Sequence, residues 1–250
     1  MIDHSDLSLA VIALAFLAAG LVKGATGLGL PPVAMAILAI AMPPVEAASL
    51  VVLPSLLANL WQTFDGAKLV PLVRRLWPLL LAAILTTLAG AGWLAAGDGT
   101  LATTVLGIVL MLYATSGLVR APFAIGATTQ RWAGPLVGTL TGAATAATGV
   151  SSVPVTPYLQ AIGLEREELI QAMGLSFTVS TVALGVNLSL SHAVPLSPSW
   201  SLAAALVAAG GGVWAGTRVR RRVDEATFRR IFLVVLFGLG LFLVARAVGD

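Results

Sequence analysis

Two segments of the chain combine glycine, hydroxyl-bearing and proline residues in the same order, and these residue types can bind an anion mostly through neutral groups. The first motif, residues 23–32, reads KGATGLGLPP, and the second motif, residues 145–154, reads TAATGVSSVP. At an offset of 122 residues the two share Ala-Thr-Gly and the later proline. Glycine permits unwound backbone, and proline fits the first turn of a following helix. Because a helix start presents free amide groups and the positive end of its dipole, the motifs predict an anion site.

We expect the binding residues to come from these motifs and from polar residues on the helices beside them. Lys23 is a cation next to a motif and could pair with an anion. Asn59, Gln62 and Gln171 are amides that are costly to bury in lipid, so they should face protein or a cavity. For them, a ligand role and a helix-to-helix hydrogen bond are both open; Tyr158 could donate its hydroxyl or be an interfacial aromatic. Small residues also allow close helix packing, which is the alternative role for the motifs. The candidates are Lys23, Thr26, Gly27, Gly29, Pro32, Asn59, Gln62, Thr148, Gly149, Ser151, Ser152, Pro154, Tyr158 and Gln171.

The composition predicts that these residues lie in a membrane protein. Of the 250 residues, 58% are hydrophobic and 10% are charged, and the mean hydropathy is +0.97. A soluble domain needs more charge to cover its surface, so we predict an all-α integral membrane protein. A helix that crosses the hydrocarbon needs roughly 20 apolar residues. Six of ten apolar stretches are long enough; the ten are 7–22, 30–42, 45–64, 76–96, 100–119, 132–147, 153–162, 169–190, 199–217 and 228–248.

The distribution of basic residues predicts two halves of inverted topology. The first two stretches of each half are short and joined by a motif, so each half (1–121 and 122–250) would hold a broken or re-entrant helical hairpin and three transmembrane helices. The positive-inside rule places three basic connectors in the cytoplasm and both termini outside. The segments before the first connector and after the second must then cross in opposite directions. The basic residues are Lys68, Arg74, Arg75, Arg120, Arg131, Arg218, Arg220, Arg221, Arg222, Arg229 and Arg230.

The depth of the motifs is open in the sequence. If the two short stretches form a re-entrant hairpin, Lys23 lies near the middle of the membrane. If all three stretches cross, it lies at the cytoplasmic interface, where it would snorkel. In the re-entrant arrangement the two motif tips approach from opposite sides, and we expect them to meet near the midplane and form one anion site.

Several other kinds of protein are disfavoured. Cysteine is absent, and we expect no metal and no cofactor. The pI near 10 reflects short basic connectors, so nucleic-acid binding is not expected. Serine chemistry at Ser151 or Ser152 would need a base, and the two histidines, His4 and His192, are both expected outside. We therefore predict a non-enzyme whose partners are a small anion and membrane lipid, with a coupling proton or sodium ion and a homo-oligomer left open.

The two motifs, together with the tail GTRVRRR at 216–222 and FRR at 228–230, resemble the duplicated signature of the sulfite exporter TauE/SafE family, also called the toluene sulfonate uptake permease family. Many members have a denser glycine run, whereas this chain has Leu28 and Leu30 in the first motif and two serines in the second. The resemblance implies a secondary transporter of the bacterial cytoplasmic (inner) membrane that moves sulfite, organosulfonates or related organosulfur anions by alternating access. A passive anion channel and a carrier of a non-sulfur carboxylate are the alternatives.

Overall fold

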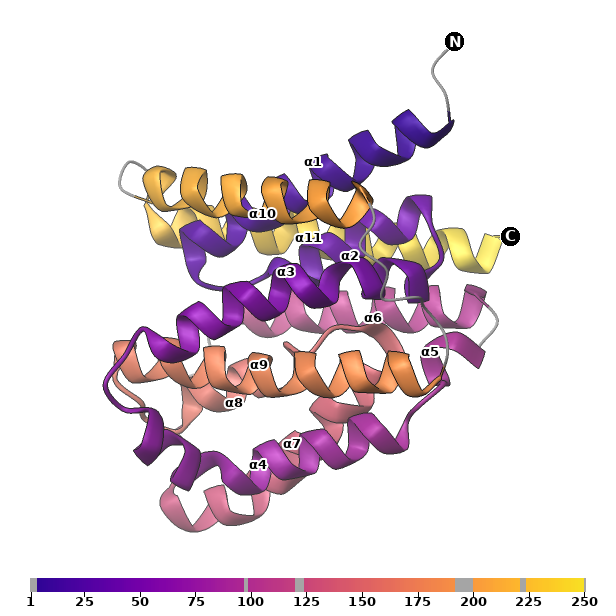
Figure 1. The fold of residues 1–250 in the computed structure, drawn as a ribbon. Helices are drawn as coiled ribbons and strands as arrows, with labels where there is room; N and C mark the ends of the chain where they lie inside the picture. Colours follow the sequence, from indigo (N-terminus) through magenta and orange to yellow (C-terminus); the bar gives the residue numbers. More distant parts are fainter. Residues whose placement is uncertain (1–3, 97–98, 120–123, 192–199, 221–223, 250) are drawn as a thin grey trace.

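The computed structural model describes residues 4–96, 99–119, 124–191, 200–220 and 224–249 (Figure 1). In those ranges the chain forms eleven helices and no strand. Arg120, His192, Arg221 and Arg222, which entered the predictions above, lie outside the described residues. The helices are α1 (His4–Thr26), α2 (Leu30–Ala41), α3 (Pro44–Phe64), α4 (Leu69–Ala89), α5 (Trp93–Ala96), α6 (Gly99–Leu118), α7 (Ala127–Thr148), α8 (Val155–Ala161), α9 (Arg166–Leu190), α10 (Trp200–Val219) and α11 (Glu225–Gly249).

Seven of these helices are long and apolar enough to cross a membrane, namely α1, α3, α4, α6, α9, α10 and α11. This confirms the prediction of a helical membrane protein. The predicted number of long stretches was six, and the seventh is α1, which continues through Lys23 and Gly24 to a length of 23 residues. Helix α7 also has 22 residues but is less apolar than the seven. The second helix of each broken unit is the short one, with 12 residues in α2 and seven in α8.

The long helices pack in four extensive pairs. Helix α1 lies beside α10, α4 beside α7, α3 beside α9, and α6 beside α11; Figure 1 shows the first two pairs at opposite sides of the molecule with α3 and α9 between them. The order of elements makes α1 the counterpart of α7 and α4 the counterpart of α10. Exchanging each helix for its counterpart in the other half therefore turns the pair of α1 and α10 into the pair of α7 and α4. The same exchange leaves the pairs α3 with α9 and α6 with α11 unchanged. The division into repeats at residue 121 stays a prediction, which this exchange supports.

Glycines bring paired helices into backbone contact. A Cβ on Gly20 of α1 would lie 2.3 Å from the carbonyl oxygen of Ala209, and one on Gly212 of α10 would lie 2.3 Å from that of Leu17. The pair α6 and α11 shows the same contact: a Cβ on Gly107 would lie 2.6 Å from the carbonyl oxygen of Gly240, and a Cβ on Gly240 would lie 2.7 Å from that of Gly107. Apolar burial gives little drive between helices in lipid, so this close packing is what holds them together.

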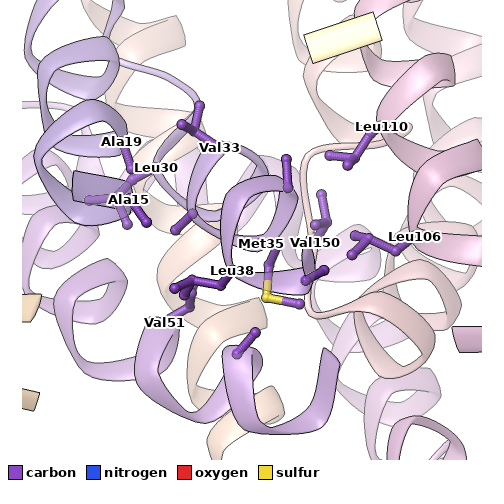
Figure 2. Close-up of a cluster of buried hydrophobic side chains, with 14 of the residues drawn as sticks. Ala15, Ala19, Leu30, Val33, Met35, Leu38, Val51, Leu106, Leu110 and Val150 are labelled. Carbon is purple, nitrogen blue, oxygen red and sulfur yellow. The ribbon is translucent and has the colours of Figure 1, made fainter. Parts of the chain in front are cut away.

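Two apolar clusters surround the short helices. Helix α2 is buried among Val51, Leu106 and Leu110, and Figure 2 shows Met35 of α2 near Val150 of the second motif. Helix α8 lies in the other cluster, which also contains Leu28 of the first motif. Each motif thus inserts its tip residue into the cluster around the short helix of the other unit. A helix enclosed by protein need not match the thickness of the bilayer, which is why short α2 and α8 are tolerated.

Candidate functional site: a buried lysine between two helices

The first motif forms the end of α1 and the turn into α2. Its threonine closes the helix: Thr26 Oγ1 donates to the carbonyl of Val22 at 2.9 Å and accepts from the Leu28 amide at 3.2 Å. Gly27 follows with φ of +75°, the left-handed conformation that glycine adopts most readily at a helix end. The conformation also aims the Gly27 amide at the carbonyl of Lys23, 2.8 Å away. The residue types of the motif therefore serve first to stop α1 and turn the chain.

The second motif repeats this geometry. Thr148 Oγ1 donates to the carbonyl of Ala144 at 2.6 Å and accepts from the Val150 amide at 3.2 Å, and Gly149 has φ of +72°. Ser151 and Ser152 follow, 3% and 2% exposed, and Pro154 precedes α8. The hydroxyls of both threonines are thus bonded to nearby backbone groups. For these motifs the sequence had suggested anion binding, with close helix packing as the alternative.

The helix starts after the motifs offer fewer amide donors than expected. Gly29, with φ of +90°, is the N-cap of α2, and Pro31 and Pro32 occupy the first positions of that helix. Proline has no amide hydrogen, so two of the donors that would face an anion are missing. The amide of Val33 donates to the Gly29 carbonyl at 3.1 Å. A helix dipole alone is therefore a weak basis for an anion site at the start of α2.

The two motif tips do not meet. A Cβ on Gly27 would lie 4.0 Å from Gln62 Nε2, whereas one on Gly149 would lie 3.2 Å from the Cβ of Ala48. Gln62 and Ala48 are both on α3, 14 residues apart, which is about 21 Å at 1.5 Å per residue. Gly27 thus lies near the end of α3 and Gly149 near its start. The expectation of one site shared by both tips is corrected accordingly.

Lys23 instead finds its partners on α3. Its ammonium group donates to Asn59 Oδ1 at 2.7 Å and to Gln62 Oε1 at 2.5 Å, and the side chain is only 7% exposed. The Phe177 ring of α9 lies beneath the ammonium, 5.8 Å from nitrogen to centroid. Gln62 is fixed in turn, because its Nε2 donates to the Ile170 carbonyl of α9 at 2.8 Å. Three helices, α1, α3 and α9, therefore hold one cation.

This cation is held by neutral oxygens. Within the described part of the chain no carboxylate oxygen pairs with Lys23 Nζ inside 4.0 Å. Asn59 is fully buried and its Nδ2 has no hydrogen-bond partner; Ser55, one turn earlier on α3, has an unpartnered Oγ as well. A buried positive charge and unpaired donors are each costly unless a ligand compensates them. The pair of Lys23 and Asn59 thus lacks a negative, hydrogen-bond-accepting partner.

A groove leads to this cluster. It has a volume of about 410 Å³ between α1, α3 and α10, and Lys23 and Gln62 lie in its wall beside largely apolar residues such as Leu206 and Val213. Exposed Asp65 lies at its rim. A pocket with apolar walls and a few convergent polar groups is the usual form of a small-molecule site.

Lys23 lies close to one end of the helices. It is in the last turn of α1, Gln62 is two residues before the end of α3, and Gly24 packs against Val213 and Thr217 near the end of α10. The positive-inside rule predicts that all three of these ends face the cytoplasm. Lys23 therefore lies near one end of the helices, with its side chain turned inward to α3. That this end faces the cytoplasm stays a prediction.

Gln171 and Tyr158 have other surroundings. Gln171 Nε2 donates to the carbonyls of Thr63 and Gly66, both at 2.9 Å, and its Oε1 accepts from the Lys68 amide at 3.0 Å. These bonds use its amide to close the end of α3. Tyr158 lies in the α8 cluster, with its hydroxyl 3.4 Å from the Gln130 carbonyl. The structure therefore brings Lys23, Asn59 and Gln62 together, with Gly27 beside Lys23 and Gln62 in the wall of the groove.

Sequence reasoning missed Phe177, whose ring faces the lysine, and Ser55, whose buried hydroxyl is unpartnered one turn before Asn59. Ser55 stands four residues before Asn59, and that spacing on a helix was the available signal. Phe177 carries no such signal, because a phenylalanine in an apolar helix is ordinarily part of the core.

Comparison with known protein families decides the class of protein. The family model of the sulfite exporter TauE/SafE matches residues 12–243. The chain belongs to the sulfite exporter TauE/SafE family. This TauE/SafE protein is thus a multi-pass membrane transporter, in agreement with the resemblance and with the seven candidate spans. No curated protein and no solved structure matches the chain.

Proposed function

We propose that this protein is a secondary transporter for small sulfur-containing anions, sulfite or organosulfonates, which bind at Lys23 between α1 and α3. The observation that carries the proposal is the buried ammonium group held by amide oxygens, with Nδ2 of its partner Asn59 unpartnered and Ser55 Oγ, one turn earlier on α3, unpartnered as well. An anion would supply both the missing charge and the missing acceptors. The family supports the choice of a sulfur oxyanion as the substrate.

Alternating access fits the helices that hold the site. Lys23 belongs to the first half of the chain, and Phe177 and Ile170 belong to the second. A movement of one half against the other would therefore open or close the site. Export is favoured energetically, because an inside-negative potential drives an anion outward; uptake would require coupling to protons or sodium ions.

Binding and flux of purified protein test this proposal. Calorimetry would measure the Kd for sulfite, methanesulfonate and acetate with wild type, Lys23→Met, Lys23→Arg and the control Lys68→Met, which removes an exposed lysine from the connector after α3. A lost charge-assisted hydrogen bond of about 1.5–3 kcal/mol corresponds to roughly 10- to 150-fold weaker binding. We expect that loss for Lys23→Met, partial retention for Lys23→Arg, and no change for Lys68→Met.

Flux into proteoliposomes separates the remaining alternatives. Saturable exchange that is accelerated by anion on the far side supports a carrier, whereas non-saturating flux would show a channel. Tighter binding of acetate than of methanesulfonate would indicate a carboxylate carrier. Equal affinity of Lys23→Met and wild type for every anion would overturn the assignment of the site.

A further inference from the structure

A small enclosed cavity lies behind the first motif, on a different side of α1 from the lysine groove. It is bounded by Thr26 of α1, Ser116 of α6, Thr156 and Gln160 of α8, and Arg229 of α11. Its volume of about 10 Å³ admits about one water molecule. Thr156 is 4% exposed, and its hydroxyl has no hydrogen-bond partner. A buried hydroxyl without a partner is costly, and a polar molecule in the cavity would supply that partner.

A larger hollow adjoins this cavity from outside. It has a volume of about 560 Å³ between α6 and α11, and its lining includes Leu118, Thr227 and Arg230. The hollow and the cavity share Gly117, Arg229 and Leu233 in their linings, so these three residues form the wall between them. Both lie at the ends of α6 and α11 that the positive-inside rule predicts to face the cytoplasm.

The wall consists of the Gly117 backbone and the side chains of Arg229 and Leu233. Arg229 Nη2 reaches the carbonyl oxygen of Gly117 only at 3.5 Å, the limit of a hydrogen bond. The Leu233 side chain covers Gly117 so closely that a Cβ there would lie 2.7 Å from it. Arg229 and Leu233 thus both contact Gly117 at the boundary between the hollow and the cavity.

The guanidinium group of Arg229 can also select anions over cations. Its one hydrogen bond in the described structure is to that neutral carbonyl. A guanidinium group has further donors arranged to bind oxyanions. The cavity behind Arg229 is also lined by Ser116, Thr156 and Thr26, and Thr26 is three residues from Lys23 in the sequence.

We propose that Arg229 is the cytoplasmic binding residue for the anion and that the small cavity behind it, whose mixed lining includes the hydroxyls of Ser116 and Thr156, is the passage to the first motif. The passage is closed in this structure at the contact between Arg229 and Gly117. The proposal rests on the transport function only for the identity of the anion, because the route itself can be tested with a chemical probe.

Cysteine labelling provides that test, since the chain has no cysteine of its own. The variant Thr156→Cys would place a thiol in the cavity, and Leu118→Cys would place one in the open hollow as the control. Each is treated in proteoliposomes with methanethiosulfonate reagents that carry either a sulfonate or a trimethylammonium group. The same measurements are made with Arg229→Gln or Arg230→Gln added; Arg230 lines the hollow but not the cavity.

We expect Thr156→Cys to react at least about tenfold faster with the anionic reagent than with the cationic one, the effect of roughly one charge-assisted contact. Arg229→Gln should remove that preference, Arg230→Gln should retain it, and Leu118→Cys should react in every background. If Leu118→Cys reacts while Thr156→Cys does not, or if Arg229→Gln leaves the preference intact, the passage is refuted. Labelling is independent of Lys23, so failure of the lysine site in the binding assay would not be confused with failure of this route.

Discussion

Lys23 of α1 and Asn59 of α3 are joined by a 2.7 Å hydrogen bond from the ammonium group to Oδ1, while Nδ2 of the same amide is buried without a partner. The pair presents donors to its surroundings and has no negative group of its own. Burial of these groups has a desolvation cost, which an anion can offset on binding. The following predictions separate this ligand role from the structural roles of the residues nearby.

Replacing Asn59 by aspartate should give the lysine a permanent negative partner. We expect Asn59→Asp to weaken anion binding at least about tenfold, because the internal ion pair competes with the ligand. The thermal midpoint should rise, since the buried charge is then compensated. Asn59→Leu, the control, should also weaken binding but lower the midpoint. Calorimetry and thermal unfolding in detergent measure both quantities, and wild-type affinity in Asn59→Asp would contradict the ligand role.

The membrane class and the turn at each motif could be predicted from the sequence because they depend on composition and local backbone preference. Asn59 and Gln62 were recognised as costly to bury, and Lys23 as a cation next to a motif. Their pairing across 36 and 39 residues depends on how α1 packs against α3, which no local pattern records.

The depth of the motifs was the part that sequence reasoning could not fix. The first apolar stretch was expected to end at residue 22, before a motif whose glycines permit unwound backbone. In the structure the helix continues, because Gly24 packs so closely on α10 that a Cβ would lie 2.2 Å from the Val213 carbonyl. This tertiary contact extends α1 and carries the tip to the end of α3, next to Gln62.

The three consecutive glycines of α10 should differ sharply in tolerance. Gly212 faces the backbone of Leu17 on α1, where a Cβ would lie 2.3 Å away, whereas Gly210 and Gly211 have no atom within 4 Å of such a Cβ. Gly212→Ala should destabilise the protein by about 1–3 kcal/mol through overpacking. Gly210→Ala and Gly211→Ala should be neutral or stabilising by up to about 1 kcal/mol, because alanine favours the helix. Thermal midpoints of the three variants check this order, and equal effects would contradict the packing of α1 on α10.

Gly27 should be required for its backbone conformation and not for space. Its φ is +75°, yet a Cβ would have only Gln62 Nε2 near it, at 4.0 Å. Gly27→Ala should cost about 1–2 kcal/mol because a left-handed residue is strained. Gly27→Asn should cost less, since asparagine tolerates that region. Unfolding measurements should therefore rank wild type above the asparagine variant and that above alanine; the reverse order of the two variants would point to crowding.

Gln171 should be a structural residue although the sequence allowed a ligand role. Its amide forms three hydrogen bonds, to the carbonyls of Thr63 and Gly66 and from the amide of Lys68, and these tie α9 to the end of α3. Gln171→Leu would leave those backbone groups without their partner, and we expect a loss of roughly 2–4 kcal/mol in stability. Gln171→Glu, the control, retains the acceptor for the Lys68 amide but loses the Nε2 donors. Its thermal midpoint should therefore fall between those of wild type and Gln171→Leu. Anion affinity of the folded fraction, measured by calorimetry, should stay within about threefold of wild type because the side chain has no free group to offer a ligand. A tenfold or larger loss of affinity at unchanged stability would instead make Gln171 part of the binding site and extend that site from Lys23 across α3 to α9.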